Sequence, residues 1–497
     1  MGKNYFSKKV LQVSMLFFLI LTTNVFAQVG IGTVTPNASS VLDITSTTQG
    51  MLTPRMTTAQ RTAIASPADG LMVYDTDLKA FHYYNSATAT WTVMNSAATG
   101  RLKFKRIRST DVLATVLATE LAAGGGTKYI LDSATHYEIN GIVTFNFPID
   151  LNNASLIGID TNEDILFKTS GFLFDGASGG VVKNLTIAGG SSVFNLIGSG
   201  NTQGLIFRDC IVSGSANVGT ISGFALVFFS IVNYLGNTTG ITYTNCSRVL
   251  LSNTAWFGNN AGTFEKFTGT FSLLQKQGGF SEVNGAATGV DVSTNPTITG
   301  DAVMESVVFT GTLSTGKYVN GYTTGTFAGY NFNNKWNVRS AGIPTETDAS
   351  ATGEFSVNYP PGSGAAVSIP NSGTPAKINL ATTSATTSNF RFTTATNDAK
   401  IVYAGLKKRI VKFSGSLSFV ADNAGKTGIY IFYIAKNGVI IGQTKIYGFT
   451  ANTSDTAAIP LSGSTELNTN DFIEVFCDYF SGSAGAIKLT SLTLTAF

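Results

Sequence analysis

The feature that most constrains the fold of this chain is a long succession of short apolar runs between residues 128 and 342. Each run holds three to five apolar residues and is followed by Gly, Asn, Ser or Asp, as in YEINGIVTF, GVVKNLTIAG, QGLIFRDCIVSG and TGITYTNCSRVLLSN. Runs of this length are typical of strands, and the polar residues between them favour turns. A repeated strand-and-turn unit buries its apolar face by stacking, which predicts a solenoid.

Two of these runs share a register that suggests the length of one coil. Residues 204–210 (GLIFRDC) and 240–246 (GITYTNC) both carry a cysteine six residues after a glycine, and a slightly shifted copy begins at Gly180. Offsets of 24 and 36 residues fit coils of a parallel β-helix with variable turns. Equivalent residues of successive coils lie about 4.7–4.9 Å apart, so Cys210 and Cys246 are predicted to stack as buried thiols. A disulfide between them and a β-sandwich fold for this segment are the alternatives.

Residues 1–27 have the composition of a secretory leader. A basic start with three lysines precedes an apolar run from about residue 10 to 25, and the small residues Val25 and Ala27 stand before Gln28. The run is short for a membrane span of about 20 residues and is interrupted by polar residues. We predict a Sec signal peptide, an extracellular or cell-surface location, and no membrane span after cleavage. A retained membrane anchor is the alternative.

The charge balance argues against a nucleic-acid partner. The chain has 32 basic and 29 acidic residues, and three of the basic residues lie in the leader, so the mature chain is formally neutral. Nucleic-acid binding needs a basic surface. Charged residues make up 12% of the chain and hydrophobic residues 43%, which indicates a folded core covered by uncharged polar residues. Three cysteines and two histidines supply too few ligands for a His/Cys metal site, and we predict no metal and no cofactor.

Residues 28–100 are predicted to form a small α+β module. SVLDI has the alternation of a short strand, and TTAQRTAIASP reads as one helix with Thr57 or Thr58 as its N-cap and Pro67 after its end. GLMVYDTDLKAFHYYN is a hairpin candidate. The segments VGIGTVTPNASSVLDI and GMLTPRMTTAQRTAIASPADGLMVYDT resemble a module at the mature start of secreted Bacteroidetes proteins, and similar VGIGT segments occur in phage tail-fibre-like proteins. This resemblance implies an exported or fibre-like context and no particular activity.

Residues 101–127 are predicted to form a linker and a helix. TDVLATVLATELAA places Leu113, Val116, Leu117 and Leu121 on one helical face, and a run of three glycines ends it. The helix is expected to cap the open end of the solenoid. A short trimeric bundle is the alternative.

Residues 351–497 carry strong apolar alternation and a hairpin signal at Asn437-Gly438. About eight strands in this length, with the last at the C-terminus, predict a jelly roll. FYIAKNGVII, ELNTNDFIEVF and LTSLTLTAF resemble C-terminal domains of phage fibres and of the C1q/TNF-like group. The resemblance implies trimerisation through an aromatic face, for which the candidates are Tyr430, Phe432, Phe472 and Phe476. Alternate members of this set could instead form the sandwich core.

The sequence offers few groups for catalysis. His82 and His136 are the only histidines, and neither stands in a recognisable nucleophile motif. The solenoid resembles the right-handed β-helix domains of phage tail spikes and carbohydrate-active proteins. This resemblance implies that an active site here would consist of paired carboxylates. The candidates are Asp160, Glu163, Asp164, Asp175 and the group Lys183, Arg208 and Asp209. Asp209 corresponds to Asn245 in the assumed register, which indicates a turn position for both.

Aromatic residues near the end of the solenoid suggest ligand binding. KYVNGYTTGTFAGYNFNNKW is the densest aromatic cluster, and exposed aromatic rings in a neutral Asn/Thr/Ser-rich surface suit sugars. The candidate ligand-binding residues are Tyr318, Tyr322, Tyr330 and Trp336, with Phe332 beside them. Strand core or trimer packing is the alternative role.

The predicted fold class is mainly β: a right-handed parallel β-helix over residues 128–342, a C-terminal jelly roll and a small α+β N-terminal module. The predicted function is a secreted or cell-surface trimeric fibre that adheres to a glycan or another surface. A phage-derived tail fibre or spike, located in a virion, is the first alternative. A polysaccharide lyase or glycosidase on the β-helix is the second.

Overall fold

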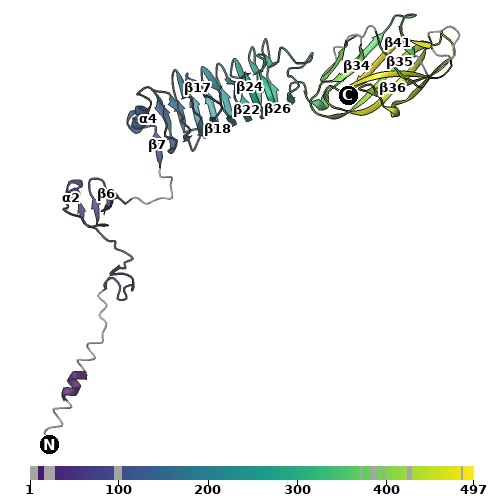
Figure 1. Cartoon of the computed structure of the whole chain (residues 1–497). Helices are drawn as coiled ribbons and strands as arrows, with labels where there is room; N and C mark the ends of the chain where they lie inside the picture. The colour runs from purple at the N-terminus through teal and green to yellow at the C-terminus, as the bar shows by residue number, and fades with distance from the viewer. Residues whose placement is uncertain are drawn as a thin grey trace. The chain divides into compact units, whose positions relative to one another are not determined.

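The computed structural model describes residues 9–15, 28–94, 103–369, 372–380, 384–385, 389–395, 398–421, 428–482 and 485–497. The chain divides into two compact units, Met1–Gly100 and Arg101–Phe497, which Figure 1 colours from purple to yellow along the chain. Residues 9–15 are helical. The predicted leader cleavage after Ala27 and the boundary at residue 100 lie outside the described residues.

The first unit contains two small sheets. Strands β1 (Val29–Ile31) and β2 (Leu42–Ile44) pair in parallel. A second sheet has the order β3-β4-β5-β6, with bounds Arg55–Met56, Met72–Asp75, Ala80–Asn85 and Thr90–Val93. The predicted hairpin is the antiparallel pair β4 and β5.

The helix of this unit, α2 (Thr58–Thr62), is shorter than the sequence indicates. Thr57 is its N-cap and forms a capping box with Gln60, which satisfies two backbone N–H groups at the start of the helix. On the sheet face that α2 covers, the Arg61 Nε lies 2.9 Å from a carboxylate oxygen of Asp75. Both side chains are buried.

The second unit begins with a parallel β-helix of about seven turns, whose stacked strands are visible in Figure 1. Within the described residues one sheet has 13 strands and the other nine. The first sheet contains β7 (Phe104–Arg108), β9 (His136–Asn140), β10 (Ile142–Thr144), β12 (Ser155–Ile157), β13 (Ile165–Phe167), β15 (Gly180–Lys183), β16 (Thr186–Ala188), β18 (Gly204–Ser213), β20 (Leu226–Leu235), β22 (Arg248–Trp256), β24 (Thr270–Glu282), β26 (Thr297–Thr310) and β28 (Trp336–Ala341). The second contains β8 (Tyr129–Ile130), β11 (Ile149–Asp150), β14 (Phe172–Gly176), β17 (Ser192–Ile197), β19 (Asn217–Ser222), β21 (Ile241–Thr244), β23 (Thr263–Thr268), β25 (Thr288–Asp291) and β27 (Lys317–Asn320).

A column of left-handed backbone positions marks one corner of the β-helix. Arg208 of β18 pairs with Ser230 of β20, and the ladder continues after one skipped residue in each strand. The skipped residues all have positive φ: Asn184, Asp209, Ile231, Asn253, Gly278 and Ser306. Gly, Asn and Asp adopt this conformation most readily. Asp209 is thus a turn residue, as predicted.

The predicted register between residues 204–210 and 240–246 is wrong. Cys210 pairs with Val232 of β20, whereas Cys246 follows β21 in the other sheet. Gly204 pairs with Leu226, which puts successive coils 22 residues apart at this point. The two cysteines are nevertheless buried and free, and burial raises the pKa of the Cys210 thiol to about 12.

The helical segment before the solenoid forms two short helices, α3 (Leu113–Val116) and α4 (Ala118–Ala123). Leu113 and Leu117 belong to the β-helix core, and Val116 and Leu121 pack against it. The segment therefore covers one end of the core, as the capping interpretation predicts. Glu120 anchors α4, because it accepts hydrogen bonds from Lys105 and from the hydroxyl of Tyr137.

The core of the β-helix contains a buried ion pair that the apolar pattern gives no reason to expect. Lys276 continues an inward row through Leu251 and Met304, and Glu265 continues one through Ile241 and Val290. The Lys276 Nζ lies 2.9 Å from the Glu265 Oε1, and both side chains are essentially inaccessible. Burial raises the pKa of Glu265, although the neighbouring lysine lowers it in part.

The chain ends in a sandwich of two antiparallel sheets. One contains β29 (Gly353–Asn358), β30 (Ala365–Ile369), β32 (Ser384–Ala385), β35 (Arg409–Ala421), β39 (Ala457–Leu467) and β41 (Gly485–Ala496). The other contains β31 (Ala376–Lys377), β33 (Phe392–Ala395), β34 (Asp398–Tyr403), β36 (Gly428–Lys436), β37 (Val439–Ile440), β38 (Ile446–Thr450) and β40 (Phe472–Gly482). Two 3-10 turns, η1 (Asp348–Ser350) and η2 (Gly442–Thr444), precede and interrupt these strands. The predicted fold class is confirmed: a mainly β chain with a parallel β-helix and a jelly roll.

Candidate interaction surfaces

Two candidate carboxylates of the β-helix, Asp160 and Asp164, accept backbone hydrogen bonds within one turn. Asp164 is buried and accepts hydrogen bonds from the backbone N–H groups of Gly141, Ile159 and Asp160. Burial raises its pKa, but these three donors outweigh burial and leave the pKa below its usual value. A catalytic acid would need the opposite shift. Asp160 lies on the surface of the same turn and accepts from Asn162, and Glu163 is exposed.

The remaining charged candidates are also engaged locally. The Arg208 Nε lies 2.8 Å from the Asp209 Oδ2, and Lys183 pairs with Arg208 in the strand ladder. Asp175 accepts a hydrogen bond of 2.7 Å from the amide of Asn195 in the next coil. The Asp175–Asn195 contact joins neighbouring coils, and the Arg208–Asp209 contact lies within one coil. Neither contact brings a second candidate carboxylate beside Asp175 or Asp209.

The two histidines lie in separate units. His82 is buried in the sheet of the first unit, with its Nδ1 3.2 Å from the carbonyl oxygen of Ala80. His136 lies at the start of β9, and its ring stacks on Phe104. Among the described residues, no group of three or more His, Cys, Asp or Glu side chains is placed to hold a metal ion.

The predicted ligand-binding cluster forms the C-terminal end of the β-helix core. Trp336 and Tyr322 are buried, so the expected exposure of these two rings is wrong. The Trp336 Nε1 donates to the Tyr322 hydroxyl, which in turn donates to the carbonyl of Pro296. Burial raises the pKa of Tyr322 to about 12. Phe332 packs on Trp336 within this core.

The other two members of the cluster are half-buried. Tyr330 stacks on Phe390 with ring centroids 3.9 Å apart, and Tyr318 donates its hydroxyl hydrogen to the Gly311 carbonyl. Only parts of these two rings remain available for a ligand. The binding role assigned to them stays a prediction.

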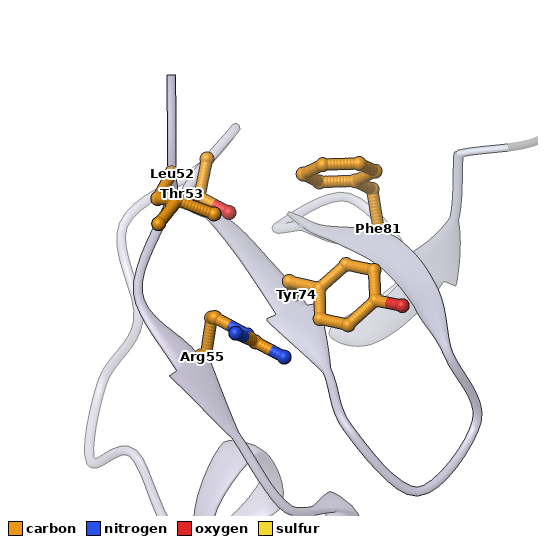
Figure 2. A pocket seen from close by; sticks show the side chains of 5 residues that line it. All are labelled: Leu52, Thr53, Arg55, Tyr74 and Phe81. Atoms are coloured by element: carbon orange, nitrogen blue, oxygen red, sulfur yellow. The ribbon is translucent and has the colours of Figure 1, made fainter. Parts of the chain in front are cut away.

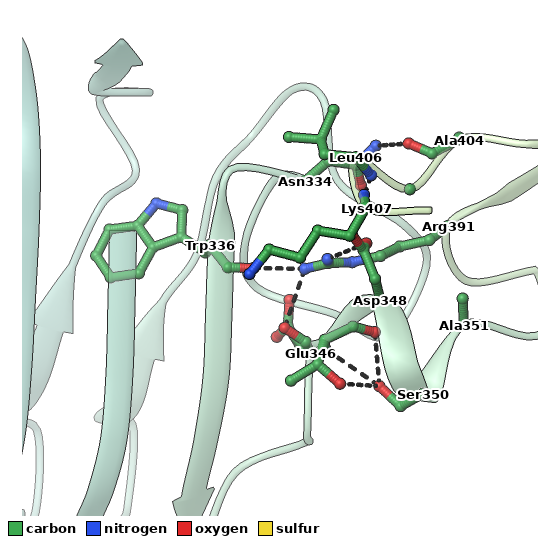
Figure 3. A network of polar contacts seen from close by, with 12 residues as sticks. Asn334, Trp336, Glu346, Asp348, Ser350, Ala351, Arg391, Ala404, Leu406 and Lys407 are labelled. Atoms are coloured by element: carbon green, nitrogen blue, oxygen red, sulfur yellow. Dashed lines mark hydrogen bonds and ion pairs between the residues drawn. The ribbon is translucent and has the colours of Figure 1, made fainter. Parts of the chain in front are cut away.

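A buried arginine joins the end of the β-helix to the jelly roll (Figure 3). The Arg391 guanidinium donates to the Asp348 carboxylate and to the backbone carbonyls of Trp336 and Glu346. The second oxygen of Asp348 accepts from the backbone N–H groups of Leu406 and Lys407. One ion pair thereby fixes segments from the last coil, the connecting turn and the jelly roll.

A polar groove of about 290 Å³ lies beside this junction. Its charged lining residues are Glu305, Arg339, Asp348 and Lys407, and Arg339 and Glu305 lie 3.5 Å apart as an exposed ion pair.

The four residues predicted for an oligomer interface divide between the two faces of one sheet. Tyr430 and Phe432 point into the jelly-roll core and pack on Phe419. Phe472 and Phe476 are only partly buried, on the alternate positions of β40. The core interpretation therefore describes Tyr430 and Phe432, and the interface role stays a prediction for Phe472 and Phe476.

Sequence reasoning missed three further aromatic residues on strands β38 and β40. Tyr447, Phe449 and Phe480 are 51%, 61% and 60% exposed. The rings of Tyr447 and Phe480 meet edge to face. We call Phe476, Tyr447, Phe449 and Phe480 the outer aromatic patch. The alternation IYGFT, with Gly448 inside, was the available signal.

The first unit carries an apolar cavity of about 250 Å³, lined by Leu52, Thr53, Arg55, Tyr74 and Phe81 (Figure 2). The strand register places Arg55 beside Tyr74 and Tyr74 beside Phe81. The Phe81 ring meets the Tyr74 ring edge to face, and the Arg55 guanidinium lies 5.6 Å from the Tyr74 ring centroid.

Comparison with known proteins places this cavity in a matched region. Residues 30–109 match the family described as a phage tail like trimerisation region. No curated protein matches the chain. Among solved structures, Eiger TNF from S. frugiperda is similar at 7% identity over 29% of this chain and 91% of that chain, with a TM-score of 0.19; this likeness is too weak to support an argument.

Together, the trimerisation region and the parallel β-helix fit a fibre-like or spike-like protein. None of the helices within the described residues is long and apolar enough to span a membrane.

Proposed function

We propose that this chain forms a homotrimeric fibre-like protein that is exported through the Sec route and adheres to a glycan or another surface outside the cell. The observation that carries the proposal is the matched trimerisation region, residues 30–109, which extends to the first strand, β7, of a parallel β-helix. A β-helix has no long exposed strand edge along its length, because each strand is paired with the coils on both sides. Such a scaffold suits a shaft that must stay folded outside the cell.

The leader-like start of the chain supports export. Its basic residues, apolar run and small residues before Gln28 have the order that signal peptidase requires. The resemblance of the following segment to secreted Bacteroidetes proteins points the same way. Mass spectrometry of the secreted chain is expected to find Gln28 as the first residue, and Ala27→Asp is expected to block processing. Secretion of the uncleaved chain would contradict this part of the proposal.

The jelly roll is the proposed adhesive end. Its outer aromatic patch offers contacts between copies, and the polar groove beside Arg339 and Lys407 offers a site for hydroxyl groups. Tyr318 and Tyr330 remain candidates for stacking on a sugar ring. The full chain is expected to bind immobilised cell-surface polysaccharide, and Arg339→Ala with Lys407→Ala is expected to weaken binding at least tenfold. A folded trimer that binds none of the polysaccharides or cells tested would overturn the adhesion proposal.

A phage-derived tail spike is the second candidate, and the description of the matched family favours it. The proposed leader separates the two functions, since virion parts assemble inside the cell. Detection of the chain in purified phage particles would make the tail spike the better-supported function. A polysaccharide lyase or glycosidase function would be supported by two results together. The chain would have to depolymerise a polysaccharide, and this activity would have to be lost in Asp160→Asn, Asp164→Asn or Asp209→Asn.

A further inference from the structure

The four-stranded sheet of the first unit has one covered and one uncovered face. Helix α2 covers the face that carries Asp75, through the contacts of Arg61. The opposite face carries the row Arg55, Tyr74 and Phe81 and the cavity shown in Figure 2. Leu52 at its rim is 82% exposed and Phe81 is 41% exposed. Burial of such apolar surface is favourable in free energy because it removes the surface from water.

A second apolar surface lies in the same unit, on strands β1 and β2. Their parallel register pairs Val29 with Leu42 and Ile31 with Ile44. Paired residues in a ladder point to the same side, and alternate residues share a face. Four aliphatic side chains therefore form one face of this small sheet, and all four are exposed. Two strands without further packing are marginally stable in water.

Within a single copy, these two apolar surfaces do not bury each other. Residues 45–51 connect them, and seven residues span at most about 25 Å. The connection is long enough to reach a nearby surface, yet Ile31 and Ile44 remain exposed, as do Leu52 and Phe81. Both surfaces lie within or at the edge of the matched trimerisation region.

We propose that the aliphatic face of β1 and β2 in one copy packs on the uncovered sheet face of a neighbouring copy, with an aliphatic side chain filling the cavity between Leu52 and Phe81. The inference rests on the proposed trimer and names the surfaces that build it. Each copy gives one surface and receives the other. Such a head-to-tail contact forms a closed ring when its rotation closes, and the matched trimerisation region indicates a ring of three. The guanidinium of Arg55 lies over the Tyr74 ring, and the aliphatic part of the Arg55 side chain adds to the apolar area of the uncovered sheet face.

Cross-linking between two different full-length variants tests this contact. One variant carries Ile31→Cys and the other Phe81→Cys, and the two are co-expressed and treated with a short bismaleimide. The natural cysteines are buried, and burial raises the thiol pKa at all three, so they react slowly. We expect a covalent pair of unlike chains. Ala87→Cys, on the exposed turn after β5, replaces Phe81→Cys as the control and is expected to lower the yield at least tenfold.

The outcomes separate this inference from the proposed function. A trimer whose unlike chains do not cross-link would overturn the inference alone. A chain with both cysteines that cross-links only to itself would show that the segment occupies its own cavity, and would also overturn it. A monomeric chain would refute the proposed trimer itself. Phe81→Asp, checked for native circular dichroism, is expected to abolish the cross-link between Ile31→Cys and Leu52→Cys chains, whereas Ala87→Asp is expected to leave it unchanged.

Discussion

The Arg391 Nη1 lies 2.5 Å from the Asp348 Oδ1, and both side chains are buried at the junction between the β-helix and the jelly roll. Arg391 also has a positive φ of 55°, so its backbone adopts a conformation that few residues other than Gly and Asn favour. The same side chain makes the ion pair and donates to the backbone carbonyls of Trp336 and Glu346. The β-helix and the jelly roll are therefore joined by a defined set of buried polar contacts.

Removal of one partner of the Arg391–Asp348 ion pair is expected to destabilise the chain. Arg391→Met leaves the Asp348 carboxylate buried without its cation, which costs about 3–5 kcal/mol in comparable pairs. Urea unfolding followed by fluorescence measures the loss. Lys408→Ala is the control, because it breaks an exposed ion pair with Glu466 that contributes at most about 1 kcal/mol. Equal effects of the two changes would contradict the assigned role.

The corner of the β-helix at Ile231 is predicted to be a site where a polar residue stabilises the fold. Ile231 has a φ of 55° and is half exposed, whereas the next coil has Asn253 at the same corner. Left-handed backbone costs an ordinary L-residue about 1–2 kcal/mol, and Asn tolerates it better. Ile231→Asn is expected to raise the free energy of unfolding by about 1 kcal/mol. Asn253→Ile is expected to lower it, and a gain in stability there would contradict the explanation.

The interior ion pair predicts a pH-dependent variant. Lys276→Met leaves Glu265 buried alone, with an expected loss of about 3–5 kcal/mol at neutral pH. The pKa of Glu265 is already raised by burial and rises further without the lysine. The folded variant therefore binds a proton more tightly than the unfolded chain, so its stability increases as the pH falls toward the ordinary value near 4.5.

Chemical denaturation at several pH values measures this trend relative to the unchanged chain. The double variant Lys276→Met with Glu265→Leu restores apolar residues at both inward positions and is expected to recover most of the stability. A deficit of the single variant that is the same at pH 4.5 and pH 7.5 would refute an ionised Glu265 as its cause.

The two faces of strands β36 and β40 predict opposite phenotypes for two phenylalanines. Phe432 is in the jelly-roll core, and Phe432→Ala is expected to cost about 3–5 kcal/mol. Phe476 lies on the outer face, so Phe476→Ala is expected to change the unfolding free energy by less than about 1 kcal/mol while weakening association of the jelly rolls. Calorimetry and light scattering on the same samples separate the two effects. An unchanged oligomer in Phe476→Ala would remove this residue from the interface.

The sequence predicts the solenoid well because Gly and Asn occur where the backbone turns into left-handed conformations. Its register was harder to predict, since the same short run recurs in both sheets. Residues 204–210 and 240–246 have similar sequences. Residues 204–210 lie in β18, whereas residues 240–246 contain β21 of the opposite sheet. Local pattern identifies strands, but the assignment of a strand to a sheet depends on turn geometry.

Burial of individual side chains was the other property that the sequence left open. Trp336 and Tyr322 stand in a polar-looking segment, but the last coil of a solenoid needs large side chains to cover its core. Glu265 and Lys276 are 11 residues apart and carry charged side chains, which are usually exposed, yet strand alternation turns both inward. Tyr447 and Phe480 lie outward for the same reason.

The central claim, a trimeric fibre-like protein, is tested most directly by the mass of the purified full chain in solution, measured by multi-angle light scattering at several concentrations. We predict three times the mass of a single chain, unchanged on dilution. A stable mass equal to one chain would contradict the account, and would leave the exposed apolar faces of the first unit and the outer aromatic patch without the partner proposed for them.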